Sequence, residues 1–396
     1  MASVGPLNMT NEVTLTPKGE RWRRSRHPWV YRDDLGPVDA ALAGRVVQVK
    51  GPDGTPVGQA FCNPRSKITL RWLTDKADEP VDRGFWAGRL KAAIELRQRV
   101  VKDSDAYRLI HSEADGFPGL IVDRYGDVLA VQSLSLGIEQ MMPVILDLLG
   151  EMLRPKAVVA RNDSPVRKLE GLAPEKKLLS GTLPDRLEVT EGNRRYRVDV
   201  MEGHKTGAYL DQRENRLWAR GFARGRVLDA FAYQGGFSLQ AAEGAQEVVA
   251  IEDSAAAVER LKENLVLNGI TNVSPSRGNA FDRLRELEKE GARFDLIILD
   301  PPAFAKNRGE IKDAWRGYKE INLRALRILG PAGTLITCSC SHLVSEEIFA
   351  EILREAAADS QRTVRFLESR TQSRDHPALL THPESKYLKC VALEAA

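Results

Sequence analysis

Two of the four cysteines in this 396-residue chain lie one residue apart, at the end of an apolar run. The stretch is TLITCSCSHL at 334–343, and the cysteines are Cys338 and Cys340. A zinc site needs about four nitrogen or sulfur ligands, and His342 is the only further candidate close by in the sequence. A redox pair usually has two residues between its cysteines. The remaining interpretations are buried core thiols and a nucleophile, because free cysteine is often buried and its thiolate is highly reactive.

Polar residues also end three other apolar runs in the second half of the chain. The runs RVLDAFA, EVVAIED and FDLIILD carry Asp229, Glu252 and Asp300. From about residue 205 such runs alternate with helical patterns, which predicts an α/β fold with a mostly parallel sheet and helices on both faces. Ligands of such sheets lie beyond the carboxyl ends of the strands. The three carboxylates and Cys340 therefore predict one site and indicate an enzyme.

The loops after the first three of these strands offer groups suited to an adenosine-bearing ligand. Gly235 in VLDAFAYQGGFS allows close backbone approach to a ligand, but a full G-x-G-x-x-G is absent, which disfavours a dinucleotide. Glu252 can accept both hydroxyls of a ribose, and Asn279 can reach an adenine edge; the alternative is that both are solvated loop residues. S-adenosylmethionine therefore fits better than NAD. The predicted cofactor-binding residues of these loops are Asp229, Phe231, Tyr233, Gly235, Glu252, Asn279, Ala280 and Asp300.

The loop DPPAFAK at 300–306 resembles the D-P-P loop of methyltransferases that act on nucleic-acid bases. Its two prolines fix φ and stiffen the backbone. Such a loop would hold the Asp300 carboxylate and the Phe304 ring over a planar substrate.

Several motifs together resemble one family, the bacterial S-adenosylmethionine-dependent 23S ribosomal RNA 5-methylcytosine methyltransferases with an N-terminal PUA domain. They are HKTGAYLDQREN at 204–215, LDAFAYQGGFS, LDPPAFAKN, TCSCSH, RHPWVY and SEADGFPGLIVDRYGD, and they span nearly the whole chain. The resemblance implies a β-rich PUA RNA-binding domain at 1–80, a central α+β domain at 81–200 and a Rossmann-like class I methyltransferase domain at 201–396. It also implies that Lys205, Thr206, Gln212 and Arg213 border the cofactor pocket.

The same resemblance selects Cys340, in the family's T-x-S-C-S pattern, as a nucleophile that adds to C6 of cytosine and activates C5. Cys340 is also nearer the carboxyl end of its strand than Cys338, which we expect to lie deeper in the core. Asp300 would hydrogen-bond the cytosine N3 and N4 region, and Phe304 would stack on the base. An unperturbed thiol is only a few per cent ionised near neutrality, so we expect the site to lower the pKa of Cys340.

The group that removes the C5 proton is not assigned by the sequence. Many related RNA 5-methylcytosine enzymes carry a second cysteine in the fourth-strand loop, where this chain has Ala303. Lys306 is one candidate for the base, and a solvent-facing lysine is the alternative.

An arginine cluster near the N-terminus suggests contact with nucleic acid. KGERWRRSRHPWVYR at 18–32 interleaves arginines with two tryptophans and a tyrosine, a combination that meets phosphates and stacks on unpaired bases. We expect Arg23, Arg24 and Arg26 to bind the RNA substrate, 23S ribosomal RNA; a solvated surface face is the alternative.

Composition describes an ordinary globular protein, with 42% hydrophobic and 29% charged residues and a net charge of +3. No apolar run is long enough to span a membrane, no secretion signal is recognisable and the cysteines are few, so we expect a cytoplasmic protein without a membrane partner. The sequence is compatible with a homodimer and predicts no metal. Two other functions stay open: an RNA amino-group methyltransferase acting on adenine N6 or guanine N2, and a non-catalytic RNA-binding assembly factor.

Overall fold

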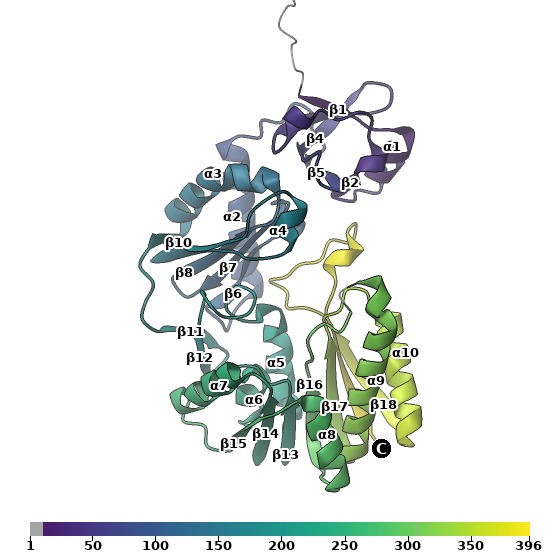
Figure 1. The fold of residues 1–396 in the computed structure, drawn as a ribbon. Coiled ribbons are helices and arrows are strands. Elements are labelled where there is room, and N and C mark those ends of the chain that lie inside the picture. The colour runs from purple at the N-terminus through teal and green to yellow at the C-terminus, as the bar shows by residue number, and fades with distance from the viewer. Residues whose placement is uncertain (1–10, 306) are drawn as a thin grey trace, which may run out of the picture.

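The computed structural model describes residues 11–305 and 307–396, which form three large sheets in succession and one two-stranded sheet (Figure 1). The N-terminal sheet has the order β1-β3-β4-β5-β2. Its strands are β1 (Glu12–Thr14), β2 (Trp29–Tyr31), β3 (Val46–Lys50), β4 (Pro56–Cys62) and β5 (Ile68–Thr74). A hairpin with Pro52-Asp53-Gly54 in its turn joins the antiparallel strands β3 and β4, and Gly54 has a φ of 82° that suits this turn. This part of the chain is β-rich, as the sequence predicts.

One helix of the N-terminal part was not predicted. The arginine-rich stretch forms α1 (Pro17–Arg24), in which only Gly19 is buried. Thr16 caps the helix by accepting the Gly19 N–H at 3.1 Å, and Pro17 occupies the first turn. Because α1 buries almost no apolar surface, it carries no hydrophobic period that would reveal it.

The central sheet has the order β10-β9-β8-β7-β6 and is covered by two long helices. Its strands are β6 (Ala106–His111), β7 (Leu120–Tyr125), β8 (Val128–Ser133), β9 (Ala157–Asn162) and β10 (Glu175–Gly181). The helices are α2 (Arg83–Val100), α3 (Leu136–Leu153) and the short α4 (Val166–Leu169). Trp86 and Leu90 of α2 and Ile145 of α3 share one core with the inner faces of β6 to β9. This is the expected central α+β arrangement.

A two-stranded hairpin, β11 (Leu187–Glu191) and β12 (Arg194–Val198), joins the central sheet to the last one. The β12 backbone N–H groups of Arg195 and Arg197 donate to the side chains of Asn268 and Asn264 at 2.9 Å, at the end of α7 (Ala255–Leu267) and within it. Buried residues of the hairpin, of the central sheet and of the last sheet form one continuous core. The hairpin contacts both neighbouring domains, so the boundary expected at residue 200 stays a prediction.

The C-terminal sheet has seven strands in the order β15-β14-β13-β16-β17-β19-β18. Its strands are β13 (Arg226–Ala230), β14 (Glu247–Glu252), β15 (Val273–Arg277), β16 (Phe294–Leu299), β17 (Leu329–Ser339), β18 (Val364–Arg370) and β19 (Lys389–Ala395). Strands β13 to β17 are parallel, and β19 runs antiparallel between β17 and β18. The helices are α5 (Arg213–Ala219), α6 (Gly236–Ala241), α7, α8 (Ala280–Lys289), α9 (Ile311–Ile328) and α10 (Glu346–Ser360). This is a Rossmann-like doubly wound sheet, as the alternating pattern predicts.

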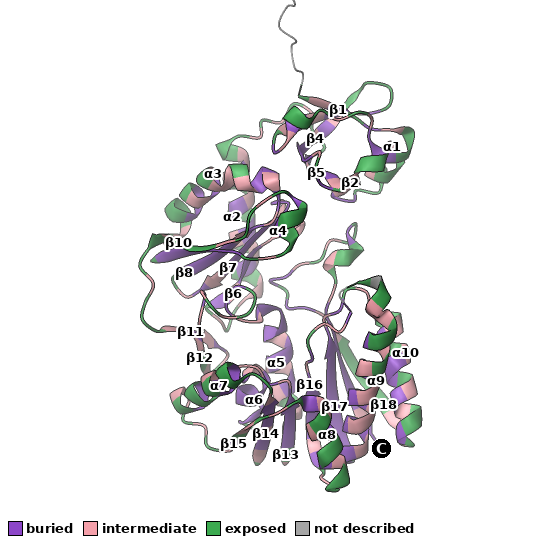
Figure 2. Cartoon of the chain, in the orientation of Figure 1, coloured by how far each residue is buried: buried purple, intermediate pink, exposed green. Residues whose placement is uncertain are grey.

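Two helical layers cover this sheet. Buried residues of α6 and α7 belong to the core on one face, and those of α8, α9 and α10 to the core on the other. The inner strands β13, β16, β17 and β19 are mostly buried, whereas the edge strands β15 and β18 are largely accessible and the helices expose their outer faces (Figure 2). In the described residues we find no helix that is both long and apolar enough to cross a membrane.

The connection between β18 and β19, residues 371–388, leaves the C-terminal sheet and reaches toward the other two sheets (Figure 1). It is the yellow segment in the middle of the molecule. The sequence pattern predicts nothing for this segment, yet it contributes to the site.

Candidate active site

A pocket of about 640 Å³ opens at the carboxyl ends of β13, β14, β16 and β17. Nine of the residues predicted for the site line it: Gln212, Phe231, Tyr233, Glu252, Asn279, Ala280, Asp300, Phe304 and Cys340. Lys205, which the family resemblance places at the cofactor, lines it too. The pocket thus brings together predicted residues that are up to 135 positions apart in the sequence, from Lys205 to Cys340, and those that follow a strand meet as the strand-end rule predicts.

The side of the pocket after β14 and β15 has the donors and acceptors that an adenosine needs. Both carboxylate oxygens of Glu252 are oriented by backbone N–H groups, from Tyr233 at 2.9 Å and Ser254 at 2.8 Å. Asn279 caps α8, and its Oδ1 accepts the Phe281 N–H at 3.0 Å. This hydrogen bond leaves the Nδ2 group of the same amide available as a donor to a ligand. Glu252 keeps lone pairs for ribose hydroxyls, and the adjacent Ile251, Ala280 and Phe281 supply apolar surface for a base. These residues fit S-adenosylmethionine.

Three non-glycine residues of the pocket have left-handed backbone conformations. The φ angles are 53° for Lys205, 70° for Phe231 and 48° for Tyr233. Such conformations are rare outside glycine and cost roughly 1–3 kcal/mol each, so the surrounding fold must enforce them. They aim the backbone and side chains of two loops into the same pocket.

Asp300 lies at the end of β16 and is held by a chain of amides. Gln212 donates from Nε2 to Asp300 Oδ1 at 2.8 Å, and Asn215 donates in turn to Gln212 Oε1 at 2.7 Å. Burial raises the pKa of Asp300 to about 6, and the amide of Gln212 opposes this rise. Gln212 was predicted as a cofactor contact; its direct partner here is the carboxylate of the D-P-P loop.

Cys340 follows the last residue of β17 and is partly exposed to the pocket. Its Sγ lies 3.9 Å from the carbonyl oxygen of Pro301, to which the thiol donates. Burial and then the nearby Asp300 raise the pKa of Cys340 to about 11, although Lys205 and Lys389 lower it. The expectation that the site lowers this pKa is wrong for the protein by itself, because the low-dielectric pocket and the carboxylates outweigh the two ammonium groups.

Cys338 is fully buried and lies directly across from Cys390 of β19 in the sheet. Burial raises the pKa of its thiol well above the ordinary value. Its position in the interior is that of the core thiol expected for it.

Four other predicted residues lie behind the pocket wall rather than in it. Asp229 is buried, accepts from Ser238 Oγ at 2.5 Å, and has its pKa raised to about 7 by burial. Gly235 is the N-cap of α6 with a φ of 87°, and a Cβ there would meet Leu261, so glycine allows the helices to pack closely. Arg213 pairs with Asp375 at 3.0 Å, and Thr206 donates to Asp123 at 2.6 Å.

The predicted RNA contacts of the N-terminal part lie away from this pocket. Arg23 and Arg24 of α1 both pair with Glu20, at 2.7 and 3.0 Å. Arg26 is exposed just after the helix, with a φ of 60°. Lys306 lies outside the described residues. The side chains of Arg24 and Arg26 are accessible, and their role in RNA binding stays a prediction.

Several residues of the pocket were not predicted from the sequence. His204, Tyr209, Asp211 and Tyr387 line it as well. Asp211 joins two of its neighbours, accepting from Lys205 Nζ and from Tyr387 OH, both at 2.6 Å. The motif HKTGAYLDQREN contains three of these four, but Tyr387 comes from the irregular segment before β19, which has no period to flag it.

A second, wider cleft of about 1190 Å³ adjoins the pocket and lies among the three sheets. The two hollows share His204, Lys205, Tyr209, His342 and Tyr387. Trp29 of β2, residues of the central sheet, and His382 and Glu384 of the segment before β19 also line the cleft. A molecule much larger than the cofactor can therefore approach Cys340 from this side.

The sheet order, the strand-end pocket and its adenosine-type donors define a Rossmann-like methyltransferase that depends on S-adenosylmethionine. A family model described as S-adenosylmethionine-dependent methyltransferase matches residues 172–383, and one for a PUA-like domain matches residues 13–75. Proteins named Ribosomal RNA large subunit methyltransferase I, from Shewanella denitrificans and Erwinia tasmaniensis, are each 39% identical over 96% of this chain and 98% of their own. The chain belongs to the ribosomal RNA large subunit methyltransferase I family.

Solved structures agree with this fold. A candidate methyltransferase named SMU.776, complexed with SAH, superposes with a TM-score of 0.83 at 19% identity, covering 97% of this chain and 99% of its own. A candidate SAM-dependent methyltransferase from Streptococcus mutans gives a TM-score of 0.81 over the same shares. At this identity the likeness concerns the fold alone, including the arrangement of three sheets.

Proposed function

We propose that the protein methylates C5 of a cytosine in 23S ribosomal RNA through a covalent adduct with Cys340. The observation that carries the proposal is the thiol of Cys340, which opens into the cofactor pocket next to Asp300. An amino-group methyltransferase has no task for a thiol at this place. The names of the two relatives supply the class of RNA, and the adjoining cleft is large enough to admit a polynucleotide segment.

The reaction starts at the thiol. Cys340 loses its proton, and its thiolate adds to C6 of the cytosine, so that a C–S bond forms and the C5–C6 π electrons move to C5. S-adenosylmethionine, when bound, would supply the methyl group that C5 takes, its S–CH₃ bond breaking to leave S-adenosylhomocysteine. A base then removes the C5 proton, the electrons of that bond restore the C5–C6 double bond, and the thiolate leaves.

The neighbours of the thiol have defined tasks in this scheme. Asp300, fixed by Gln212, faces the polar edge of the base and, in its protonated form below pH of about 6, can donate to N3. Lys205 favours the thiolate electrostatically. Phe304 lies in the same wall, with its ring 4.6 Å from that of Tyr318, and offers a flat surface to the base. The base for the C5 proton is left unassigned.

Nucleoside mass spectrometry tests the proposal. Unmodified large-subunit ribosomal RNA is incubated with the protein and S-adenosylmethionine, and the digest is searched for methylated nucleosides. We expect 5-methylcytidine with the wild type and with Cys338→Ala, and none with Cys340→Ala. A methylated purine, or activity that is indifferent to Cys340→Ala, would refute the thiol mechanism. RNA containing 5-fluorocytidine should trap a covalent complex, because fluorine cannot leave C5 as a proton does.

A further inference from the structure

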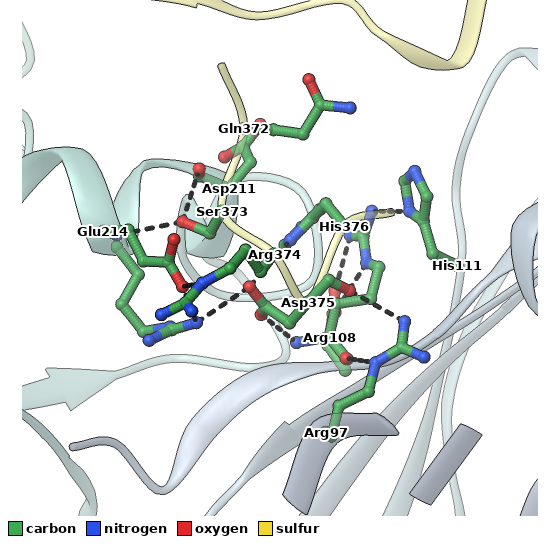
Figure 3. A network of polar contacts seen from close by, with 12 residues as sticks. Arg97, Arg108, His111, Asp211, Glu214, Gln372, Ser373, Arg374, Asp375 and His376 are labelled. Atoms are coloured by element: carbon green, nitrogen blue, oxygen red, sulfur yellow. Dashed lines mark hydrogen bonds and ion pairs between the residues drawn. The ribbon is translucent and has the colours of Figure 1, made fainter. Parts of the chain in front are cut away.

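The segment between β18 and β19 is fastened at its base by buried charges (Figure 3). Asp375 is fully buried; its carboxylate accepts the Arg108 backbone N–H at 2.9 Å and Arg213 Nη2 at 3.0 Å. Its carbonyl oxygen accepts Arg97 Nη2 at 2.8 Å. Arg97 and Arg108 belong to the central part of the chain and Arg213 to α5. The base of the segment is thus tied to two domains at once.

The tip of the segment is a tight turn with bonds of its own. Leu379 and His382 form an antiparallel bridge, with the His382 N–H donating to the Leu379 carbonyl at 3.0 Å. Ser385 accepts the Leu379 N–H at 2.9 Å through its hydroxyl, and its carbonyl accepts Gln372 Nε2 at 2.7 Å. Leu380 stands in the turn and is 100% exposed. A large apolar side chain is therefore presented to solvent on a well-braced support.

A cluster of rings fixes the turn on the N-terminal side. The His382 ring lies 4.4 Å from that of Trp29 and 5.0 Å from that of His27, and Glu384 Oε2 lies 3.5 Å from His27 Nε2. His27, His382 and Glu384 resemble a set of metal ligands, since their ligand atoms lie within 4.8 Å of one another. However, the Trp29 backbone N–H donates to His27 Nδ1 at 3.2 Å, so Nδ1 acts as an acceptor and Nε2 is the ring nitrogen that faces Glu384. The cluster is better suited to holding the turn than to binding a metal.

The turn stands at the cleft that leads to Cys340. His382, Glu384 and Ser385 line the cleft, while Tyr387 and Leu388 line the cofactor pocket. Leu380 is two residues from His382, so their Cα atoms are at most about 7 Å apart. The described lining of the cleft holds four Lys or Arg residues and four Asp or Glu residues, a balance that gives phosphates little net attraction. Binding of RNA in this cleft must therefore use other contacts besides attraction between basic side chains and phosphates.

A cytosine inside a helix has to leave the base stack before a thiol can reach C6. Extrusion costs a few kcal/mol, and apolar side chains such as leucine are known to insert between bases and fill such a gap. A single exposed leucine is ordinary on a protein surface. The unusual feature of Leu380 is that its turn is clamped at the base and at the side, so that inserting it costs little further ordering.

We propose that Leu380 inserts into the RNA base stack in the place left by the cytosine that enters the Cys340 pocket. This inference rests on the proposed function. Leu380 then contacts the substrate directly, and its contribution depends on whether the target base is stacked. An unpaired, unstacked cytosine needs no filling of a gap.

The test compares two RNAs that share one sequence around the methylated cytosine, one folded with that base paired and one fully unpaired. For Leu380→Ala we expect kcat/KM to fall about 10- to 100-fold on the paired RNA and to stay within twofold on the unpaired RNA. Leu380→Met should restore most of the loss, because methionine is apolar and of similar size. Val266→Ala, at an 82% exposed position on α7, is the matched control and should have no effect. A 2-aminopurine next to the target should brighten with wild-type protein and much less with Leu380→Ala.

Several outcomes would overturn the inference. If Leu380→Ala lowers kcat/KM equally on both RNAs, Leu380 contributes to RNA binding in general and not to filling a gap in the stack. If kcat/KM falls on neither RNA, Leu380 does not contact the RNA. A loss confined to assembled ribosomal subunits would indicate a protein partner. If Leu380→Ala no longer binds S-adenosylmethionine and Leu380→Met does not restore the loss, the effect is structural. If the wild type makes no 5-methylcytidine, the proposed function fails as well, whereas methylation by the wild type with an unchanged Leu380→Ala rejects this inference alone.

Discussion

Replacing Glu252 by glutamine should weaken binding of S-adenosylmethionine without unfolding the protein. Each carboxylate oxygen of Glu252 already accepts one backbone N–H, from Tyr233 at 2.9 Å and Ser254 at 2.8 Å. Glutamine turns one oxygen into an NH₂ group, which faces a backbone donor and can no longer accept from a ribose hydroxyl. A hydrogen bond to a charged group contributes about 1.5–3 kcal/mol. At 1.4 kcal/mol for each factor of ten, the Kd should rise about 10- to 150-fold.

Isothermal titration calorimetry with S-adenosylmethionine measures this directly, and titration with S-adenosylhomocysteine should show the same loss because the ribose is unchanged. Glu247→Gln is the matched control, because Glu247 lies at the other end of β14 and pairs with Arg226 at 3.0 Å. It should bind like the wild type. A Kd for Glu252→Gln within twofold of the wild-type value would refute the assignment of Glu252 to the ribose.

Three further predictions follow from buried ionisable groups. The rate of alkylation of Cys340 by iodoacetamide should rise about tenfold per pH unit from pH 7 to 9, because burial raises its pKa to about 11 and the thiolate is the reactive form; a plateau below pH 9 would contradict this. Asp229→Asn should stabilise the protein by up to about 4 kcal/mol at pH 8 and by little at pH 4. The reason is that the folded-state pKa of Asp229, about 7, lies above the unfolded value, so the wild type loses stability as pH rises between the two values. Urea unfolding of both proteins at both pH values tests this, and the same difference in free energy of unfolding at pH 4 and pH 8 would contradict it. Asp375→Asn should lower the free energy of unfolding by about 3–5 kcal/mol in urea titrations, because Arg213 loses a buried opposite charge, and a change below about 1 kcal/mol would argue against the pair.

The strand-end residues were predictable from the sequence because one rule covers them. Parallel strands end at the same edge, so Glu252, Asp300 and Cys340 had to approach one another once the alternating pattern was recognised. The mostly parallel sheet follows from the same pattern, whereas the order of its strands was not predicted. The prediction could not distinguish residues that face the pocket from those one layer behind it, which is why Asp229 and Gly235 were expected to contact the cofactor.

Other features depend on contacts between distant parts of the chain. Asp375 meets Arg108 across 267 positions, and no local pattern indicates that partnership. The pKa of Cys340 depends on burial and on Asp300 and Lys205, none of which is visible in the motif TCSCSH. Helix α1 had one usable signal, the cap Thr16 followed by proline, but without an apolar stripe no helix was predicted there.

The uneven exposure of the four thiols has a practical consequence for inhibitor design. Cys62, Cys338 and Cys390 are buried, and Cys340 alone among them is partly exposed, inside the pocket that holds Glu252. An adenosine analogue that carries a mild electrophile would first be held reversibly at the Glu252 side and then meet a single nucleophile. Methyltransferases with the same cofactor pocket but no thiol at this strand end would release such a compound unchanged. The fold thus offers selectivity through reactivity rather than through the shape of a widely shared cofactor site.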